Sequence, residues 1–374
     1  MKILLVAPGA VYSTYDCYKY QLEAMHDNKE VEVQGFNYHN TLTFNRVALD
    51  KLFAHYSEAD KQAVASVRSA REIILDAIVF KPDVVMFVSG TLIPPEVYIE
   101  LANVRHELNR PFAIAIYFTE SPYMNEMQDA FTRYADVLFV NDKYAVDRYD
   151  PDHSHYIEYL PHSFNPKVHY SGDNNRIDNK YISDVFFGGT VFKERLDMIS
   201  SVSWGNTKLK LLGGWQEWGD TEQGKALDRY FVKGKIFNDN SEYAKYYRGT
   251  KIALNVHRTR GDIEGESEPL DNYKDAYSIG PRIYEAVACG AFLITDYRKE
   301  AEDIFGDTIE FFDGSEDLER KIHYWLDPAH EQERRNKADA ARERIQDCTF
   351  DDRLENIILP TFREVLQLRR IKNE

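Results

Sequence analysis

Cysteine is scarce in this sequence: Cys17, Cys289 and Cys348 are scattered through 374 residues. An odd number at these distances matches neither the paired framework of a disulfide-stabilised secreted protein nor the close spacing of a zinc site. The three side chains are therefore expected as reduced thiols in a cytoplasmic protein. No His/Asp cluster has metal-ligand spacing, and Asp-x-Asp in a strand context is also missing. Neither a metal nor a bound cofactor is expected.

Long apolar runs are missing as well. No stretch approaches the ~20 consecutive apolar residues of a membrane-spanning helix. The opening residues, MKILLVAP, read as a buried strand and are too short for the apolar region of a signal peptide. No membrane span is predicted.

Positive charge is in deficit. The 46 Lys and Arg residues stand against 62 Asp and Glu residues, which gives a formal net charge of −16. Such a chain has no general electrostatic attraction to duplex DNA or to an anionic membrane, so both are disfavoured as partners. A local basic cleft is compatible with this balance, and a ligand that carries phosphate would need one.

What the sequence does contain is an alternation of short apolar runs with helical patterns. Residues 84–90 (VVMFVSG) follow a long amphipathic segment at 58–80, and the rhythm restarts at 184–187 after a strongly polar stretch. This alternation predicts an α/β fold in which parallel sheets are covered by helices on both faces.

The length favours two domains. The polar stretch 171–180 is the best linker, so the predicted domains are 1–170 and 171–350. A last amphipathic helix, 351–374, either spans both domains or packs back on the first.

Ligands of such sheets bind beyond the carboxyl ends of the strands. In the first half, the segments expected there are 9–15, 89–91 and 118–123. The last of these carries Glu120, which directly follows a buried strand. Glu120 is either a general base for a reaction at a hydroxyl group or the cap of the following helix.

In the second half, four strand ends carry glycine or arginine. They are Gly188–Thr190, Gly213–Trp215, His257–Arg258 and Ser278–Arg282, and Arg195 follows the first of them. Glycine loops and arginines that meet at one helix N-terminus predict a phosphate-binding site. The long polar loop 259–275 is either a lid over this site or an insertion.

The segment Ser278–Asp296 reads as a short helix that ends at Gly290 and leads into a buried strand. Arg282 and Glu285 are three residues apart and so share one helix face. The carboxylate would suit a pair of sugar hydroxyls. The alternative is a helix packed on a sheet with a surface Arg–Glu pair.

The second half resembles the nucleotide-binding lobe of GT-B glycosyltransferases, and more narrowly the CgeB-like, group-1-type members. The N-terminal half is similar only in pattern, through STYD (13–16) and ESPY (120–123). The segments that carry the resemblance are YLPHSFNPKVH (159–169), DVFFGGTVFKER (184–195), IALNVHR (252–258) and RIYEAVACGAFLITD (282–296).

The resemblance implies two Rossmann-like domains facing across a cleft, and transfer of a hexosyl or pentosyl group from a nucleotide sugar, with a UDP-sugar favoured and no essential metal. Glu285 would bind the donor's ribose, and Ser13, Thr14 and Tyr15 would form the acceptor-side loop. The other implied donor-binding residues are Gly189, Thr190, Arg195, Arg258, Ser278, Gly280 and Arg282.

Two positions depart from the family pattern. Retaining members often have two glutamates eight residues apart, whereas Tyr277 stands eight before Glu285. Gly280-Pro281 stands where Asn would be expected before the arginine. The stereochemical course therefore stays open, and so does the acceptor: a glycan, a protein, a small metabolite or a modified DNA base. Two rival functions are a sugar- or nucleotide-binding protein without chemistry and a nucleotide-sugar epimerase.

Overall fold

The computed structural model describes residues 1–7, 22–107, 111–149, 156–172, 177–233, 240–262, 264–271 and 275–373. They form two compact units: Met1–Pro161 together with Phe350–Glu374 (unit 1), and His162–Thr349 (unit 2). The sequence predicted divisions after residues 170 and 350. Ser13, Thr14, Tyr15 and Cys17 lie outside the described residues.

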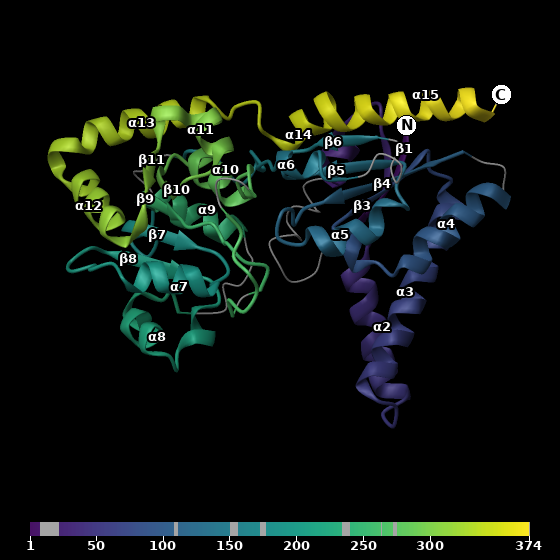
Figure 1. Cartoon of the computed structure of the whole chain (residues 1–374), viewed down its shortest axis with the longest axis horizontal. Helices are drawn as coiled ribbons and strands as arrows, with labels where there is room; N and C mark the ends of the chain where they lie inside the picture. Colours follow the sequence, from purple (N-terminus) through teal and green to yellow (C-terminus); the bar gives the residue numbers. More distant parts are fainter. Residues whose placement is uncertain are drawn as a thin grey trace. The chain divides into compact units, whose positions relative to one another are not determined.

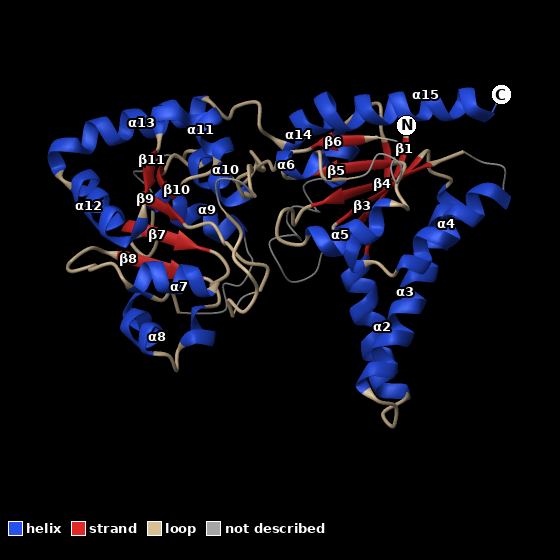
Figure 2. Cartoon of the chain, viewed as in Figure 1, coloured by secondary structure: helices blue, strands red, loops and turns tan. Residues whose placement is uncertain are grey.

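The described strands of unit 1 form one parallel sheet in the order β2-β1-β3-β4-β5-β6 (Figure 2). The chain passes from β1 outward to β2 and then returns to β3 on the other side of β1. This reversal makes the β1/β3 boundary the topological switch point of unit 1. The strands are β1 (Lys2–Ala7), β2 (Glu32–Asn37), β3 (Val84–Val88), β4 (Ala113–Phe118), β5 (Val137–Val140) and β6 (Ile157–Tyr159).

Helices cover both faces of this sheet, as the apolar runs predict. Alternate residues of β1 point to opposite faces, so that Leu4 packs with Ile73 of α3 while Leu5 packs with Phe362 of α15. The helices are α2 (Tyr38–Leu52), α3 (Glu58–Phe80), η1 (Gly90–Leu92), α4 (Pro95–Glu107), α5 (Asn125–Thr132), α6 (Lys143–Val146), α14 (Phe350–Arg353), the π-helical turn η7 (Leu354–Ile358) and α15 (Leu359–Asn373).

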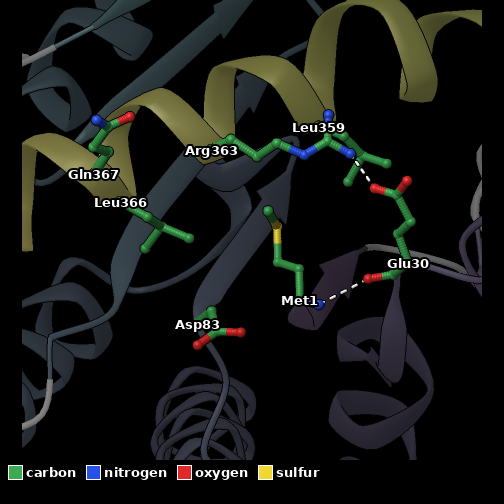
Figure 3. A pocket seen from close by; sticks show the side chains of 7 residues that line it. All are labelled: Met1, Glu30, Asp83, Leu359, Arg363, Leu366 and Gln367. Carbon is green, nitrogen blue, oxygen red and sulfur yellow. Dashed lines mark hydrogen bonds and ion pairs between the residues drawn. The ribbon is translucent and has the colours of Figure 1, made fainter.

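The C-terminal helices belong to unit 1 and not to the unit that precedes them in the chain. Phe350, Leu354 and Phe362 are buried against the sheet, and the rings of Phe362 and Phe139 lie 5.8 Å apart. α15 also walls a cavity at the amino end of the sheet (Figure 3), where Arg363 forms an ion pair with Glu30. The lining residues are Met1, Glu30, Asp83, Leu359, Arg363, Leu366 and Gln367.

The described strands of unit 2 also form a parallel sheet, in the order β11-β10-β9-β7-β8. The chain leaves β7 for β8 on one side and then crosses to β9 on the other. The β7/β9 boundary is therefore the switch point of unit 2. The strands are β7 (Ser183–Gly188), β8 (Leu209–Leu212), β9 (Thr250–Asn255), β10 (Phe292–Asp296) and β11 (Glu310–Phe312).

The two faces of this sheet have separate cores. Phe186 packs with α9 and α10, whereas its neighbour Phe187 packs with α7 and η3 on the opposite face. The helices are α7 (Lys193–Ser200), η3 (Trp215–Trp218), α8 (Glu222–Leu227), η4 (Asp228–Tyr230), α9 (Asn240–Gly249), α10 (Pro281–Ala288), α11 (Lys299–Phe305), η5 (Gly306–Thr308), α12 (Gly314–Leu326), η6 (Pro328–His330) and α13 (Glu331–Glu343).

Each unit is thus a doubly wound α/β domain, and the predicted fold class is confirmed. None of the helices in the described part of the chain combines the length and apolar character needed to cross a membrane.

Candidate functional site

The candidate site lies at the switch point of unit 2, where β7 and β9 end. Gly189 follows β7 and donates its backbone N–H to the carbonyl of Leu212, at 2.8 Å. Gly213 follows β8, and a side chain there would overlap the carbonyl of Gly189. Both glycines have positive φ, +143° and +141°, which an L side chain rarely adopts. The two glycine loops therefore pack backbone against backbone and contribute no side chains of their own to this edge of the sheet.

Arg282 reaches the same edge from the first turn of α10. Its Nη1 donates to the Oδ1 of Asn255, the last residue of β9, at 3.2 Å. A methyl group at Gly189 would overlap the Arg282 guanidinium, which lies 5.2 Å from the centre of the Phe187 ring. The predicted meeting of an arginine with a glycine loop is therefore present, and this arginine spans the β7/β9 switch point.

Asn255 is held in turn by β10. Its Nδ2 donates to the Oγ1 of the fully buried Thr295 at 2.9 Å. This fixes the amide so that its oxygen faces Arg282. Asn255 was not predicted as a site residue, although its position at a strand end was a usable signal.

Arg195 also connects the two strand ends, but it does so through backbone groups. Its Nε donates to the carbonyl of Val256 at 2.7 Å, and its Nη1 donates to that of Thr190 at 2.8 Å. The side chain is buried. Arg195 therefore acts on the shape of the loops after β7 and β9, while Thr190 itself is exposed.

Arg258, two residues beyond Val256, is half-buried, and its guanidinium lies 5.1 Å from the centre of the Phe192 ring. A planar cation over an aromatic face is held in orientation. Arg258 follows β9, and Arg282 lies in the first turn of α10. Both arginines are therefore placed at the carboxyl edge of the sheet.

The N-terminus of α10 has open space beside its first residues. Gly280 is the N-cap, Pro281 is the first helical residue, and a side chain at Gly280 would meet nothing within 4 Å. Glu300 fixes this turn from α11, because its carboxylate accepts from the N–H of Ile279 at 2.6 Å and from the hydroxyl of Tyr284 at 3.0 Å. Ser278, just before this turn, is buried.

Glu285 lies one turn into α10 and is half-buried. Burial raises the pKa of Tyr243 to about 12, with Arg282 opposing the shift and Glu285 adding to it. Burial likewise raises the pKa of Tyr247, with the same two charges acting on it. Both α9 tyrosines therefore stay protonated at neutral pH and lie within the electrostatic reach of the Arg282–Glu285 face.

A buried His–Asp pair supports the end of β9. Asp296 accepts from the backbone N–H of His257 at 2.9 Å, and the Nδ1 of His257 lies 2.7 Å from the same carboxylate oxygen. Burial lowers the pKa of His257, although Asp296 opposes this. Burial would raise the pKa of Asp296, but the charge and hydrogen bonds of His257 outweigh it and lower that pKa. Asp296 is therefore held as a carboxylate and orients the segment that carries Arg258.

Tyr277, the residue in place of a second glutamate, has a partner on α11. Its hydroxyl donates to Asp303 at 2.9 Å, and burial together with this carboxylate raises its pKa. The side chain is thus engaged with α11.

In unit 1, Glu120 follows β4 at the carboxyl edge of the sheet and is half-buried. The helix after it begins at Asn125, and its N-cap is Met124, so Glu120 is not that cap. The preceding Thr119 shares a 2.6 Å hydrogen bond with the hydroxyl of Ser89, which has φ of +53°. Ser89 follows β3, beside the switch point of unit 1, and this bond connects the segments that follow β3 and β4.

Two further features lie away from these edges. The cavity beside α15 is at the amino end of the unit 1 sheet, which is not where doubly wound folds bind ligands. Among the described residues, no group of three or more His, Cys, Asp or Glu side chains is placed to hold a metal ion.

Comparison with known proteins adds two findings. Residues 192–358 match the family model described as "Glycosyl transferase-like". No curated protein sequence matches the chain.

Solved structures of similar fold cover nearly the whole chain. A glycosyltransferase from Rickettsia africae has a TM-score of 0.61 at 13% identity, covering 98% of both chains. The N-terminal domain of a Candida albicans trehalose-6-phosphate phosphatase has a TM-score of 0.61 at 10% identity, covering 97% of both. Anabaena HepE in complex with UDP-glucose has a TM-score of 0.58 at 11% identity, covering 96% of this chain and 99% of HepE. At these identities the likeness shows the fold, which is that of GT-B glycosyltransferase structures.

Proposed function

We propose that the protein transfers a sugar from a nucleotide-sugar donor, a UDP-sugar by preference, to a hydroxyl acceptor. The observation that carries this proposal is the position of Arg282. It spans the switch point of unit 2, between Asn255 and the Gly189 loop, and stands beside the open N-terminus of α10. The match to the glycosyl transferase-like model over 192–358 and the UDP-glucose bound by HepE support this choice over a generic phosphate site.

In this proposal the donor diphosphate lies between the α10 N-terminus and the glycine loops. The free space at Gly280 admits an oxygen close to the helix amides, and Arg282 and Arg258 supply two positive charges. Gly189 and Thr190 line the same edge, and Arg195 holds their backbone. Glu285, one turn further into α10, accepts hydrogen bonds from the ribose hydroxyls.

The reaction breaks the bond between the sugar C1 and the diphosphate oxygen, and it forms a bond from C1 to the acceptor oxygen. The negative charge that develops on the leaving diphosphate is stabilised by the two arginines and the helix amides, so no metal is required. The acceptor hydroxyl loses its proton. In an inverting course Glu120 of unit 1 takes that proton as general base; in a retaining course the leaving diphosphate takes it.

The test is incubation with a panel of nucleotide sugars and acceptors in the presence of EDTA. The proposal expects release of the nucleoside diphosphate, an acceptor–sugar adduct, and undiminished rates in EDTA. An altered donor sugar without an adduct would identify an epimerase, and binding without any product would identify a binding protein. NMR of the product anomer distinguishes the two courses, and Glu120→Gln should abolish transfer only in the inverting one.

A further inference from the structure

The outer face of α3 carries an unusually apolar stripe. Its members follow one another at helical spacing, so they share one face of the helix, and Val79 is 78% exposed. The opposite face is buried through Ala65, Ile73 and Ala77. The helices α2 and α3 run side by side and extend away from the strands of unit 1 (Figure 1). The stripe consists of Val64, Val67, Leu75, Ile78 and Val79, all exposed.

Four charged residues lie along the stripe, between Val64 and Val79. The two basic residues, Arg68 and Arg71, precede the two acidic residues, Glu72 and Asp76. Within the described part of the chain none of the four forms an ion pair, and Glu72 accepts only a 3.5 Å bond from Asn45.

The charges at the far end of the same hairpin behave differently. There Lys61 pairs with both Asp50 and Glu58, and Arg46 pairs with the same two carboxylates. Four charged residues at the far end are thus paired with one another, whereas the four charged residues of the stripe form no ion pair. An apolar surface with unpaired charges of both signs is suited to a partner that supplies the complement.

We propose that this surface binds a second copy of the same chain, with the two α3 helices packed antiparallel about a two-fold axis near Arg71 and Glu72. Antiparallel packing brings Arg68 and Arg71 of each helix towards Glu72 and Asp76 of the other. With the axis between Arg71 and Glu72, Arg71 lies opposite Glu72 of the second copy, and Val64 lies opposite Val79. A two-fold interface is self-complementary: if residue i of one copy contacts residue j of the other, residue j of the first copy also contacts residue i of the second.

The order of the charges favours antiparallel pairing over two alternatives, which are parallel pairing of the same helices and binding to a lipid surface. Parallel pairing of the helices would put arginine against arginine and carboxylate against carboxylate. A lipid surface would leave Glu72 and Asp76 without partners and, if anionic, would repel them. The 23 residues of α3 span roughly 35 Å, so the seam is long enough for a specific contact.

The first test is sedimentation equilibrium of the whole chain over a range of concentrations. The wild type should show a concentration-dependent monomer–dimer equilibrium, and Val67→Asp should raise the dimer dissociation constant at least tenfold. The matched control is Val47→Asp on α2, where a valine of similar exposure is changed in the same way. A wild type that stays monomeric, or a control that dissociates the dimer as well as Val67→Asp does, would overturn the proposal.

The second test exchanges the four charged residues of the stripe. Their side chains are exposed or half-buried, so the substitutions leave the hydrophobic core intact. Arg68→Glu with Arg71→Glu makes the stripe wholly acidic, and Glu72→Arg with Asp76→Arg makes it wholly basic. Each double variant should be monomeric alone, and the two should form a heterodimer when mixed. Absence of a heterodimer contradicts the antiparallel arrangement. Cosedimentation of a monomeric wild type with phosphatidylcholine–phosphatidylglycerol vesicles, abolished by Val67→Asp, would identify a lipid surface instead.

Discussion

The guanidinium of Arg282 lies against the backbone of Gly189, so closely that a Cβ atom at position 189 would overlap it. The contact joins α10 to the end of β7, and the bond from Arg282 to Asn255 joins the same side chain to the end of β9. Arg282 is thus oriented by the protein before any ligand arrives. A binding group that is already in position loses less conformational entropy when it binds.

The Gly189–Arg282 contact predicts a non-additive pair of substitutions. Gly189→Ala forces the methyl group into the guanidinium and also places alanine at φ of +143°, so a loss of about 2–4 kcal/mol in the free energy of unfolding is expected. In the background of Arg282→Ala the overlap is gone and only the backbone strain is left. Denaturant unfolding of the four proteins should therefore give a coupling energy of about 1 kcal/mol or more. Additive losses would mean that the two residues do not constrain each other.

Glu300 is predicted to act through the start of α10. Glu300→Ala leaves the N–H of Ile279 and the hydroxyl of Tyr284 without their acceptor, which should cost about 2–4 kcal/mol of stability and weaken UDP binding. Tyr284→Phe removes only the second of these bonds and is the matched variant, expected to keep UDP affinity. Thermal unfolding and calorimetric titration with UDP measure the two effects. If Glu300→Ala destabilises the protein but binds UDP as the wild type does, Glu300 does not position the site.

His169 is predicted to make unit 2 sensitive to acid. Burial, with a smaller effect from the charge of Arg248, lowers its pKa to about 3, although a hydrogen bond to the backbone of Asn165 opposes this. As pH falls below the ordinary histidine pKa of about 6.5, the unfolded chain binds a proton at this residue while the folded chain does not. Stability should therefore fall by about 1.4 kcal/mol per pH unit between roughly pH 6 and 3.

The measurement for His169 is denaturant unfolding at a series of pH values. His169→Leu should reduce the slope of stability against pH by about the amount of one proton. His257, whose pKa is also lowered, contributes a slope of the same sign that stays in the variant. His323→Leu makes the same replacement at an exposed position of α12 and is the matched control. An unchanged slope in His169→Leu would show that His169 is not the group that titrates.

Much of the fold is predictable from local pattern. The helix expected at 58–80 is α3, and the apolar runs at 84–90 and 136–140 contain β3 and β5. The spacing of apolar residues along the sequence indicates which side chains are buried, so helices and strands can be predicted without knowing the tertiary contacts. Helix α2 was not predicted, because its exposed Phe44 and Val47 lie away from its buried face and blur the period.

The site was predictable only in part. Glycine and arginine at strand ends are local signals, and Arg282 and Gly189 do meet. The partners that give each side chain its role are distant in sequence: Arg195 bonds a carbonyl 61 residues away, and Asn255 bonds Thr295 across 40 residues. Such pairings depend on the strand order β10-β9-β7, which no local pattern specifies.

The proposed function requires the switch point of unit 2 to bind a nucleoside diphosphate through Arg282 and Glu285. The decisive measurement is calorimetric titration with UDP and UDP-glucose of the wild type, Arg282→Ala, Glu285→Ala and the surface control Arg320→Ala. The wild type and the control should bind, and Arg282→Ala should bind at least tenfold more weakly, which corresponds to about 1.4 kcal/mol. Glu285→Ala should also bind more weakly. Absence of binding to the wild type across nucleoside diphosphates and their sugars, or equal affinities in all four proteins, would contradict this requirement.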